Sequence, residues 1–224
     1  MITSKIELAD MIDVSLLKPD NTEKDMKEMA AFARKYRCIA AFSLPAFTPY
    51  VVQYLEGDTG INIGGAVGFP SGGEMTSIKK EQTIQLIKAG CTEIDMVVNV
   101  GKVKVGDDAY VLSEINTIID AAGGAPVKVI FECHYLTDDE IKRLAELCCR
   151  TEAAYIKTGT GWAPTGATKE NVTLMKSVVG NEKKVKAAGG IRDLKTVNDL
   201  YECGAVRFGV GLNAAIDIFN ELPA

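Results

Sequence analysis

The sequence predicts an α/β fold, a single-domain (β/α)8 TIM barrel with a short N-terminal helix. From residue 37 onward, short apolar runs alternate with longer segments of helical period. The runs are predominantly apolar, as is typical of parallel strands that helices cover on both faces. Eight such units fit into 224 residues without a linker or a change in composition, and a barrel of this kind has about 250 residues. We therefore expect residues 1–224 to form one barrel domain.

The first predicted strand lies in MIDVSLL and precedes a helix that we expect over residues 23–36. The eight apolar runs that we interpret as strands are residues 11–17, 38–44, 61–69, 93–100, 127–133, 154–160, 185–190 and 205–211. An open doubly wound sheet would have roughly five or six strands and an early GxGxxG turn. The sequence contains no such turn, so the closed barrel is the favoured fold.

The segments between the runs carry helix signals. Ile141, Leu144, Ala145 and Cys148 form an apolar stripe of helical period. The sequence TDDE at residues 137–140 is a capping box that begins this helix. Glycines stand where helices should end, at Gly90, Gly123, Gly180 and Gly204.

Charge and hydropathy exclude several classes of partner. The net charge is -5 and the isoelectric point is near 5.1, so the protein has no basic surface for nucleic acid or an anionic membrane. The N-terminus lacks a signal-peptide pattern, and no run of 18 apolar residues occurs. We expect a cytoplasmic protein that binds neither nucleic acid nor membrane.

The cysteines and the single histidine argue against metal and redox chemistry. Six cysteines show no CxxC spacing and mostly lie in apolar runs, which is typical of small buried hydrophobic residues. His134 is the one histidine, so a zinc site with several histidines is excluded. A serine triad would need a GxSxG turn, which is absent. We expect no metal and no cofactor.

Polar side chains stand at the ends of several predicted strands, where barrel enzymes carry their catalytic groups. They are Asp13, Asp95, Asn99, Glu132, His134, Lys157, Thr158, Thr160 and Lys186. Two of them, Lys157 and Lys186, are lysines on neighbouring strands. A lysine at the end of an apolar strand is more often a side chain with its amine in water, or half of an ion pair, so a second feature must support a chemical role.

The second feature is that the lysines are paired. A lysine amine has a pKa of about 10.4 and is not nucleophilic at neutral pH. A nearby cation and partial burial lower that pKa, and the neutral amine can then attack a carbonyl. Asp95, in EIDMVVN, can move protons through a water during imine chemistry, although it could also be a buried carboxylate that caps a loop. We predict that Lys157, Lys186 and Asp95 are catalytic.

Glycines indicate a separate anion site. GG at residues 189–190 and GVG at residues 209–211 each precede a predicted helix. Unobstructed N–H groups at two helix starts, after strands seven and eight of a barrel, are the usual place for a phosphate. The alternative is that these glycines only make turns. The expected phosphate contacts are Gly189, Gly190, Gly209 and Gly211.

Seven stretches are long enough to compare with known families: IDVSLLKP, AVGFPSG, EIDMVVNVG, VKVIFECHYLTDDEI, YIKTGTGWAPTGAT, MKSVVG and VKAAGGIR. Together they resemble deoxyribose-phosphate aldolase, a family of class I, Schiff-base aldolases. The resemblance implies a barrel that reversibly cleaves 2-deoxy-D-ribose 5-phosphate to acetaldehyde and D-glyceraldehyde 3-phosphate. By motif it makes Lys157 the Schiff-base lysine, Lys186 the neighbour that lowers its pKa, and Asp95 the proton-relay acid.

The same resemblance extends to the substrate and to the assembly. Thr158, Thr160 and Gly161 follow the Schiff-base lysine in the motif IKTGTG, and we expect them to bind substrate together with the four glycines. The substrates would be small aldehydes and sugar phosphates. The family also suggests a homodimer, which nothing in the residues tests.

The chain departs from the family pattern around the substrate and not at the amines. Phe42 and Leu44 stand where the family usually has a cysteine and an asparagine. Gly159 replaces a serine after the Schiff-base lysine, and Trp162 follows the loop glycine. Other differences are Val14 for a polar aromatic residue, Ala188 for a serine, and GVGL at residues 209–212 where the family has serines. Each hydrogen bond lost to a charged phosphate is worth about 1.5–3 kcal/mol, so these changes bear on phosphate binding.

Three other functions fit some of the residues. One is the same imine mechanism on an acceptor that is altered or carries no phosphate. Another is a non-catalytic binding relative, which the retained lysines and Asp95 disfavour. A phosphate-binding isomerase could use Glu132 as a base and His134 as an electrophile, but it leaves the paired lysines unexplained.

Overall fold

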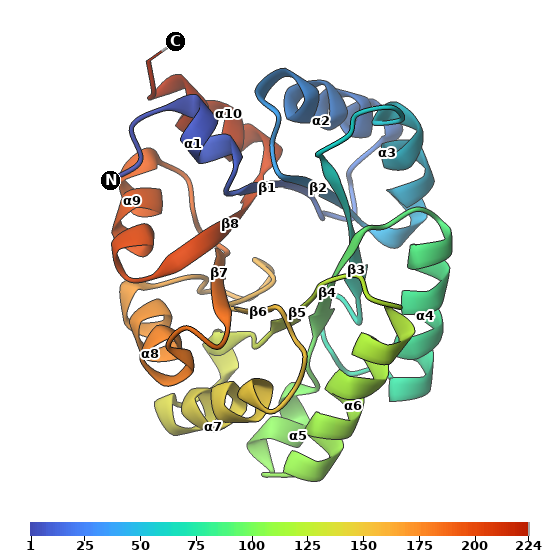
Figure 1. The fold of residues 1–224 in the computed structure, drawn as a ribbon, viewed down its shortest axis with the longest axis vertical. Helices are drawn as coiled ribbons and strands as arrows, with labels where there is room; N and C mark the ends of the chain where they lie inside the picture. The colour runs from blue at the N-terminus through green and yellow to red at the C-terminus, as the bar shows by residue number, and fades with distance from the viewer. Residues whose placement is uncertain (224) are drawn as a thin grey trace.

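Eight parallel strands form a closed barrel in this computed structural model, which describes residues 1–223 (Figure 1). Each strand pairs with the next one along the chain, and β8 closes on β1. The strands are β1 Ile12–Leu16, β2 Ala40–Ser43, β3 Asn62–Val67, β4 Glu93–Val97, β5 Val127–Ile130, β6 Tyr155–Lys157, β7 Lys184–Ala188 and β8 Ala205–Gly211. All eight lie within or beside the apolar runs of the sequence, so the predicted fold class is confirmed.

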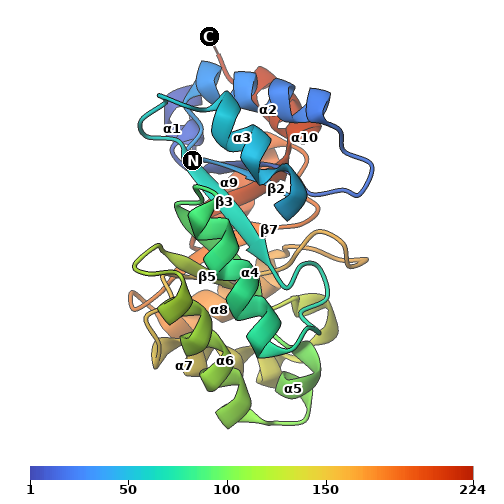
Figure 2. The ribbon, with the colours of Figure 1, turned by 90° about the vertical axis from the view of Figure 1, so that its right-hand side faces the viewer.

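Helices surround the barrel, and the predicted N-terminal helix is α1. Their bounds are α1 Lys5–Ala9, α2 Glu23–Tyr36, α3 Thr48–Tyr54, α4 Thr76–Lys88, α5 Val100–Lys104, α6 Asp108–Ala121, α7 Asp138–Cys149, α8 Lys169–Val179, α9 Leu194–Glu202 and α10 Leu212–Asn220, with 3-10 turns η1 Pro45–Phe47 and η2 Cys133–Tyr135. Both views show α1 and α10 beside the two termini, on the side of the barrel opposite α5, α6 and α7 (Figure 2). Within residues 1–223, none of the helices has the length and apolar content that crossing a membrane would need.

Local sequence signals set the helix ends. The predicted capping box is present at the start of α7, where Thr137 and Glu140 exchange side-chain and backbone hydrogen bonds. Gly180 caps the end of α8 with a positive φ of 51°, a conformation in which a side chain would be strained. These caps fix the residues at which α7 begins and α8 ends, and with them the lengths of the adjoining loops.

Successive side chains of each strand point alternately to the apolar core outside the barrel and to the barrel interior. On β4, Ile94 and Met96 pack into the apolar core between barrel and helices, whereas Glu93 and Asp95 take the alternate positions and bond to charged groups across the barrel. Residues i and i+2 of a strand share a face, so the side chains of Glu93 and Asp95 both point toward the barrel axis. Barrel interiors are usually filled by bulky branched apolar residues. This interior is charged instead.

The register places the two predicted lysines side by side. Lys157 is the last residue of β6, as expected, and pairs with Lys186. Lys186 is the third residue of β7, one place further into the strand than the predicted run 185–190 puts it. The difference arises because Lys184 and Val185 already pair with β6, and it sets the two lysine side chains at the same level of the barrel.

Candidate active site

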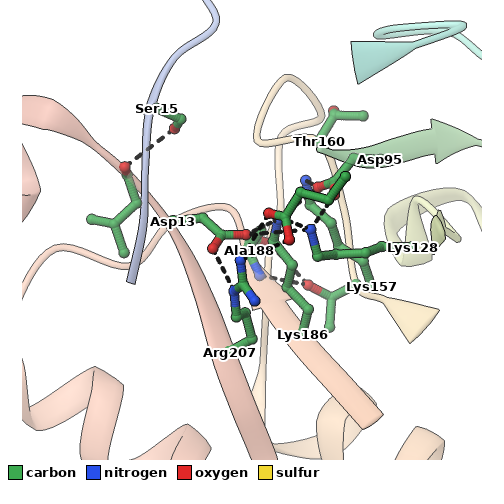
Figure 3. Close-up of polar contacts among 12 residues, drawn as sticks. Asp13, Ser15, Asp95, Lys128, Lys157, Thr160, Lys186, Ala188 and Arg207 are labelled. Carbon is green, nitrogen blue, oxygen red and sulfur yellow. Dashed lines mark hydrogen bonds and ion pairs between the residues drawn. The ribbon is translucent and has the colours of Figure 1, made fainter. Parts of the chain in front are cut away.

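Seven charged side chains meet inside the barrel, and all of them except Glu93 are labelled in Figure 3. They are Asp13 on β1, Glu93 and Asp95 on β4, Lys128 on β5, Lys157 on β6, Lys186 on β7 and Arg207 on β8, each at most 5% exposed. Four cations against three carboxylates leave one positive charge when every group is ionised. Burial disfavours a net charge. The cluster therefore favours the loss of one proton from an amine.

Asp95 is the centre of the cluster. Its Oδ2 accepts hydrogen bonds from Lys157 Nζ at 2.7 Å and Lys186 Nζ at 2.6 Å, and its Oδ1 accepts one from Lys128 Nζ at 3.0 Å. Burial acts to raise the pKa of Asp95, but the charges of the three lysines outweigh it and hold that pKa well below its ordinary value. Asp95 is thus an ionised carboxylate shared by both predicted catalytic lysines.

Lys186 is tethered more tightly than Lys157. Its Nζ also lies 2.5 Å from Asp13 Oδ2, whereas the carboxylate partner of Lys157 in the structure is Asp95. Burial is the main cause that lowers the pKa of Lys186, to about 8, with Asp13 and Asp95 opposing it and the charges of Lys157 and Lys128 adding to it. Lys186 is therefore a cation at neutral pH, but its pKa lies only slightly above neutrality, so it loses its proton easily.

Three members of the cluster were missed by sequence reasoning. Arg207 donates to Asp13 Oδ1 at 2.5 Å and to both oxygens of Glu93 at 2.8 and 3.0 Å, and Lys128 lies 2.7 Å from Glu93. Each is a charge inside an apolar run at an inward-facing position. The alternation rule, applied to those runs, would have found them. They form the floor beneath the two lysines.

A cavity of about 700 Å³ lies above the cluster and reaches the carboxyl ends of β1, β6, β7 and β8. Asp13, Lys157 and Lys186 line its base. Six of the residues that we predicted to bind substrate also line it: Thr160, Gly161, Gly189, Gly190, Gly209 and Gly211. The structure thus brings the paired lysines and the predicted glycine site to one cavity.

Thr158 does not line this cavity. Its hydroxyl donates to the carbonyl of Ala188 at 2.9 Å and accepts from the N–H of the same residue at 3.0 Å. Both bonds tie the loop after β6 to β7. The prediction that Thr158 contacts substrate is therefore not supported, because its hydroxyl faces the neighbouring strand.

One of the two predicted helix starts lies at the cavity. Gly211 is the N-cap of α10, with no side chain bonded to the free N–H groups there, and it lines the cavity with Leu212. By contrast, α9 begins at Leu194, where the side chain of Asp193 caps the N–H of Thr196. The expectation of two open helix starts is corrected to one, since an aspartate already occupies the other.

Comparison with known proteins is consistent with this geometry. Residues 11–219 match the model of the DeoC/LacD family aldolases. The chain belongs to this aldolase family. It is 39% identical over 218 residues to a deoxyribose-phosphate aldolase of Rhizobium meliloti, covering 97% of this chain and 88% of that protein, and 41% identical over 216 residues to one of Klebsiella pneumoniae, covering 96% and 87%.

A solved structure extends the likeness to the fold. The deoxyribose phosphate aldolase of Aeropyrum pernix, described as a tetramer, superposes with a TM-score of 0.89 at 28% identity and covers 97% of this chain and 92% of that one. The DeoC/LacD aldolase described here is accordingly an enzyme of the aldehyde-lyase class. The predicted family and enzyme class are confirmed.

Glu132 supports the loop after β6 in this DeoC/LacD aldolase and does not line the cavity. Its carboxylate accepts from the N–H of Thr160 at 3.2 Å and from the Thr160 hydroxyl. A Cβ on Gly159 would lie 2.6 Å from Glu132 Oε1, so the glycine leaves room for this carboxylate. The side chain of His134 bonds to Thr165 and also lies outside the cavity lining. The isomerase hypothesis, which needs both groups at the substrate, has no support.

Trp162 forms part of the cavity wall. Its indole N–H donates to the carbonyl of Leu17 at 2.9 Å, and its ring meets Phe69 edge to face with centroids 6.1 Å apart. Phe42 and Leu212 also line the cavity, but Leu44 does not. The apolar surface expected from the family departures is therefore present, with Leu44 excepted.

Proposed function

We propose that the protein is a class I aldolase in which Lys157 forms a Schiff base, and that it reversibly cleaves 2-deoxy-D-ribose 5-phosphate to acetaldehyde and D-glyceraldehyde 3-phosphate. The observation that supports this most is the pair of buried lysines sharing Asp95 at the base of the cavity. Two amines around one carboxylate, in a cluster with one surplus positive charge, provide a neutral amine at little cost.

In the proposed mechanism the neutral amine of Lys157 attacks the carbonyl carbon of the open-chain sugar. The carbinolamine that forms loses water, with a proton delivered to the departing hydroxyl, and leaves a protonated imine on Lys157. The imine accepts the electron pair of the breaking carbon–carbon bond while a base takes the proton from the 3-hydroxyl, so glyceraldehyde 3-phosphate departs and an enamine remains. Protonation of the enamine and hydrolysis release acetaldehyde. Asp95 serves these proton transfers through a water, within reach of both amines.

The phosphate would lie at the glycine rim of the cavity. Free N–H groups at the start of α10 favour an anion, and Lys18 and Arg192 also line the cavity. Three carboxylates, those of Asp20, Asp25 and Asp217, line the same cavity, so they offset both of these positive charges. Assembly as a homodimer and location in the cytoplasm stay predictions.

Trapping of the imine tests this function. Acetaldehyde with sodium borohydride should add one reduced two-carbon group per chain, and peptide mapping should place it on Lys157. Turnover of 2-deoxyribose 5-phosphate should disappear in parallel with the labelling. An enzyme that stays active with Lys157 unmodified would exclude the proposed mechanism.

Lys186→Leu should lower the rate at neutral pH by roughly a hundredfold and move the rising limb of the pH–rate profile to higher pH. Without Lys186 three cations face three carboxylates, so the cluster no longer favours the loss of a proton. The profile measured from pH 6 to 10 checks this. The exposed neighbour Lys184 provides the control, because Lys184→Leu leaves the interior charge unchanged. An unshifted profile in Lys186→Leu would contradict the electrostatic role.

The preference for the phosphorylated sugar should be weak. Positions 188, 210 and 211 carry no serine, and Trp162 and Leu212 add apolar surface, so the kcat/KM ratio of 2-deoxyribose 5-phosphate to 2-deoxyribose should be below roughly a hundredfold. Gly211→Ser should widen it, because a Cβ there has its nearest neighbour, Ser15 O, at 3.9 Å. Gly73→Ser, outside the cavity lining, is the control. A preference of several thousandfold in the unmodified enzyme would show that backbone donors suffice.

A further inference from the structure

Phe42 is an aromatic side chain among the charges of the barrel interior. It lies on β2, is 2% exposed, and is not part of the apolar core between the barrel and the helices. The centre of its ring is 4.3 Å from Lys186 Nζ and 4.8 Å from Lys128 Nζ. The same ring lines the cavity. It therefore touches the catalytic cluster at the amines of Lys186 and Lys128.

The neighbouring strand makes room for this ring. Phe42 pairs with Gly64 of β3 in the register, and a Cβ on Gly64 would lie 2.2 Å from ring carbons of Phe42. Any side chain at position 64 would push the ring away from its place. The contact between Phe42 and the amines is thus built into two strands and does not depend on a mobile loop.

An aromatic face attracts a cation and not a neutral amine. Its negative quadrupole favours an ammonium group within about 6 Å of the ring centre, and the effect is larger where water is excluded. Lys186 has this ring in addition to Asp13 and Asp95. Lys157 has Asp95, and within residues 1–223 no aromatic ring lies over its amine at such a distance. The surroundings of the two lysines therefore differ in how well they hold a proton.

We propose that Phe42 is a positioning residue that keeps the proton on Lys186, so that Lys157 is the lysine that gives up its proton and becomes the nucleophile. The inference rests on the proposed Schiff-base function. The charged groups around Lys186 are Asp13, Glu93, Asp95, Lys128, Lys157 and Arg207. Two protonation states with the same total charge compete, one with the proton on Lys186 and one with it on Lys157. The ring changes their ratio and adds no chemical step.

The pKa of Lys186 lies close to neutral pH, so small changes in its surroundings alter the ratio of the two protonation states. Burial lowers the pKa of Lys186 to about 8, so a modest loss of stabilisation brings its deprotonation into the neutral range. A cation–π contact changes a ratio of this kind by roughly twofold to thirtyfold. Without the ring, Lys186 gives up its proton at lower pH, so the state with a neutral amine on Lys186 gains population.

Graded fluorination of Phe42 tests the proposal. Fluorine weakens the quadrupole of the ring with little change in its shape. Site-specific incorporation of 4-fluoro-, 3,5-difluoro- and 3,4,5-trifluorophenylalanine at position 42 should lower kcat at pH 7 stepwise, down to roughly two- to thirtyfold for the last. The loss should shrink above pH 9, where Lys186 is neutral with or without the ring. The same series at Phe208, which packs into the outer core, should leave kcat unchanged.

Borohydride trapping gives a second readout. In the trifluoro protein and in Phe42→Leu, the share of the acetaldehyde adduct on Lys186 should rise severalfold relative to the unmodified enzyme, whereas Phe208→Leu should keep the original distribution. An unchanged kcat, pH profile and adduct distribution across the fluorinated series would overturn the role of Phe42. Absence of any adduct on Lys157 in the unmodified enzyme would instead overturn the proposed function, so the two failures are distinguishable.

Discussion

Lys157→Leu abolishes turnover in our expectation, with a loss in kcat of roughly four orders of magnitude or more. No other amine at the base of the cavity is as free to react, because Lys186 is held by Asp13 and Asp95 together. The fold should survive the change. Three cations then face three carboxylates, and Asp95 keeps Lys186 and Lys128 as partners. Steady-state kinetics and thermal unfolding of the purified variant measure the two effects.

Lys184→Leu is the matched control for this variant. Lys184 lies on β7 two residues before Lys186, and its side chain is exposed. Its removal should leave kcat within about twofold, since surface substitutions away from a site have small effects. A Lys157→Leu enzyme that retained a tenth of the original activity would show that the nucleophile lies elsewhere.

The barrel was predictable because its strands follow a simple rule. Strands buried on both faces appear as short apolar runs, and each of the eight runs contains an observed strand or overlaps one. Helix ends were predictable where a side chain makes the cap, as Thr137 does for α7. The start of α9 was not, because the sequence analysis placed it after Gly189 and Gly190, whereas the structure begins the helix at the Asp193 cap. Whether the helix starts at the glycines or at Asp193 depends on the path of the loop after β7.

The candidate site was predictable to the extent that charge stands out at a strand end. Lys157 was found in this way, Lys186 from its pairing with Lys157, and Asp95 as the acid inside the run EIDMVVN. Arg207 and Lys128 lie inside apolar runs, before the carboxyl ends of their strands, and a rule based on strand ends passes over them. The full cluster emerges only when alternation is combined with barrel closure, which brings β8 and β4 within reach of one another across the axis.

The orientation of short polar side chains could not be inferred from spacing. Thr158 and Thr160 are two residues apart and were both expected at the substrate. In the structure the Thr158 hydroxyl bonds to Ala188 on β7, and Thr160 bonds to Glu132 after β5. Both hydroxyls therefore support the loop that follows Lys157. Only the positions of the neighbouring strands decide which partner such a hydroxyl meets.

Asp95→Asn is the second change with a large expected effect. It should lower kcat by roughly 10² to 10⁴, because the group that moves protons between the amines and the substrate is lost. It should also reduce the free energy of unfolding by about 3–5 kcal/mol, since three buried lysines lose a shared carboxylate. Urea unfolding and steady-state kinetics measure these losses. Borohydride should still trap acetaldehyde on Lys157, which separates imine formation from turnover.

The pH dependence of this destabilisation follows from the charges. Four cations against two carboxylates make the folded protein release a proton more readily than the unfolded chain, which keeps its lysines charged up to their ordinary pKa. Where the unfolded state binds more protons, stability rises with pH. In the unmodified protein this rise begins near the pKa of Lys186, about 8. In Asp95→Asn it should begin at lower pH, so the difference in unfolding free energy should shrink between pH 6 and 9.

Glu93→Gln separates two effects of Asp95→Asn, the loss of a negative charge from the cluster and the loss of the group that moves protons. Glu93 is a buried carboxylate of the same cluster, but it contacts Lys128 and Arg207 and neither of the two cavity lysines. Its removal leaves the same surplus of positive charge and should destabilise the barrel to a similar degree. Turnover should nevertheless stay within about tenfold, because Asp95 still bridges Lys157 and Lys186. Equal losses of kcat in the two variants would mean that Asp95 acts only through its charge and moves no proton.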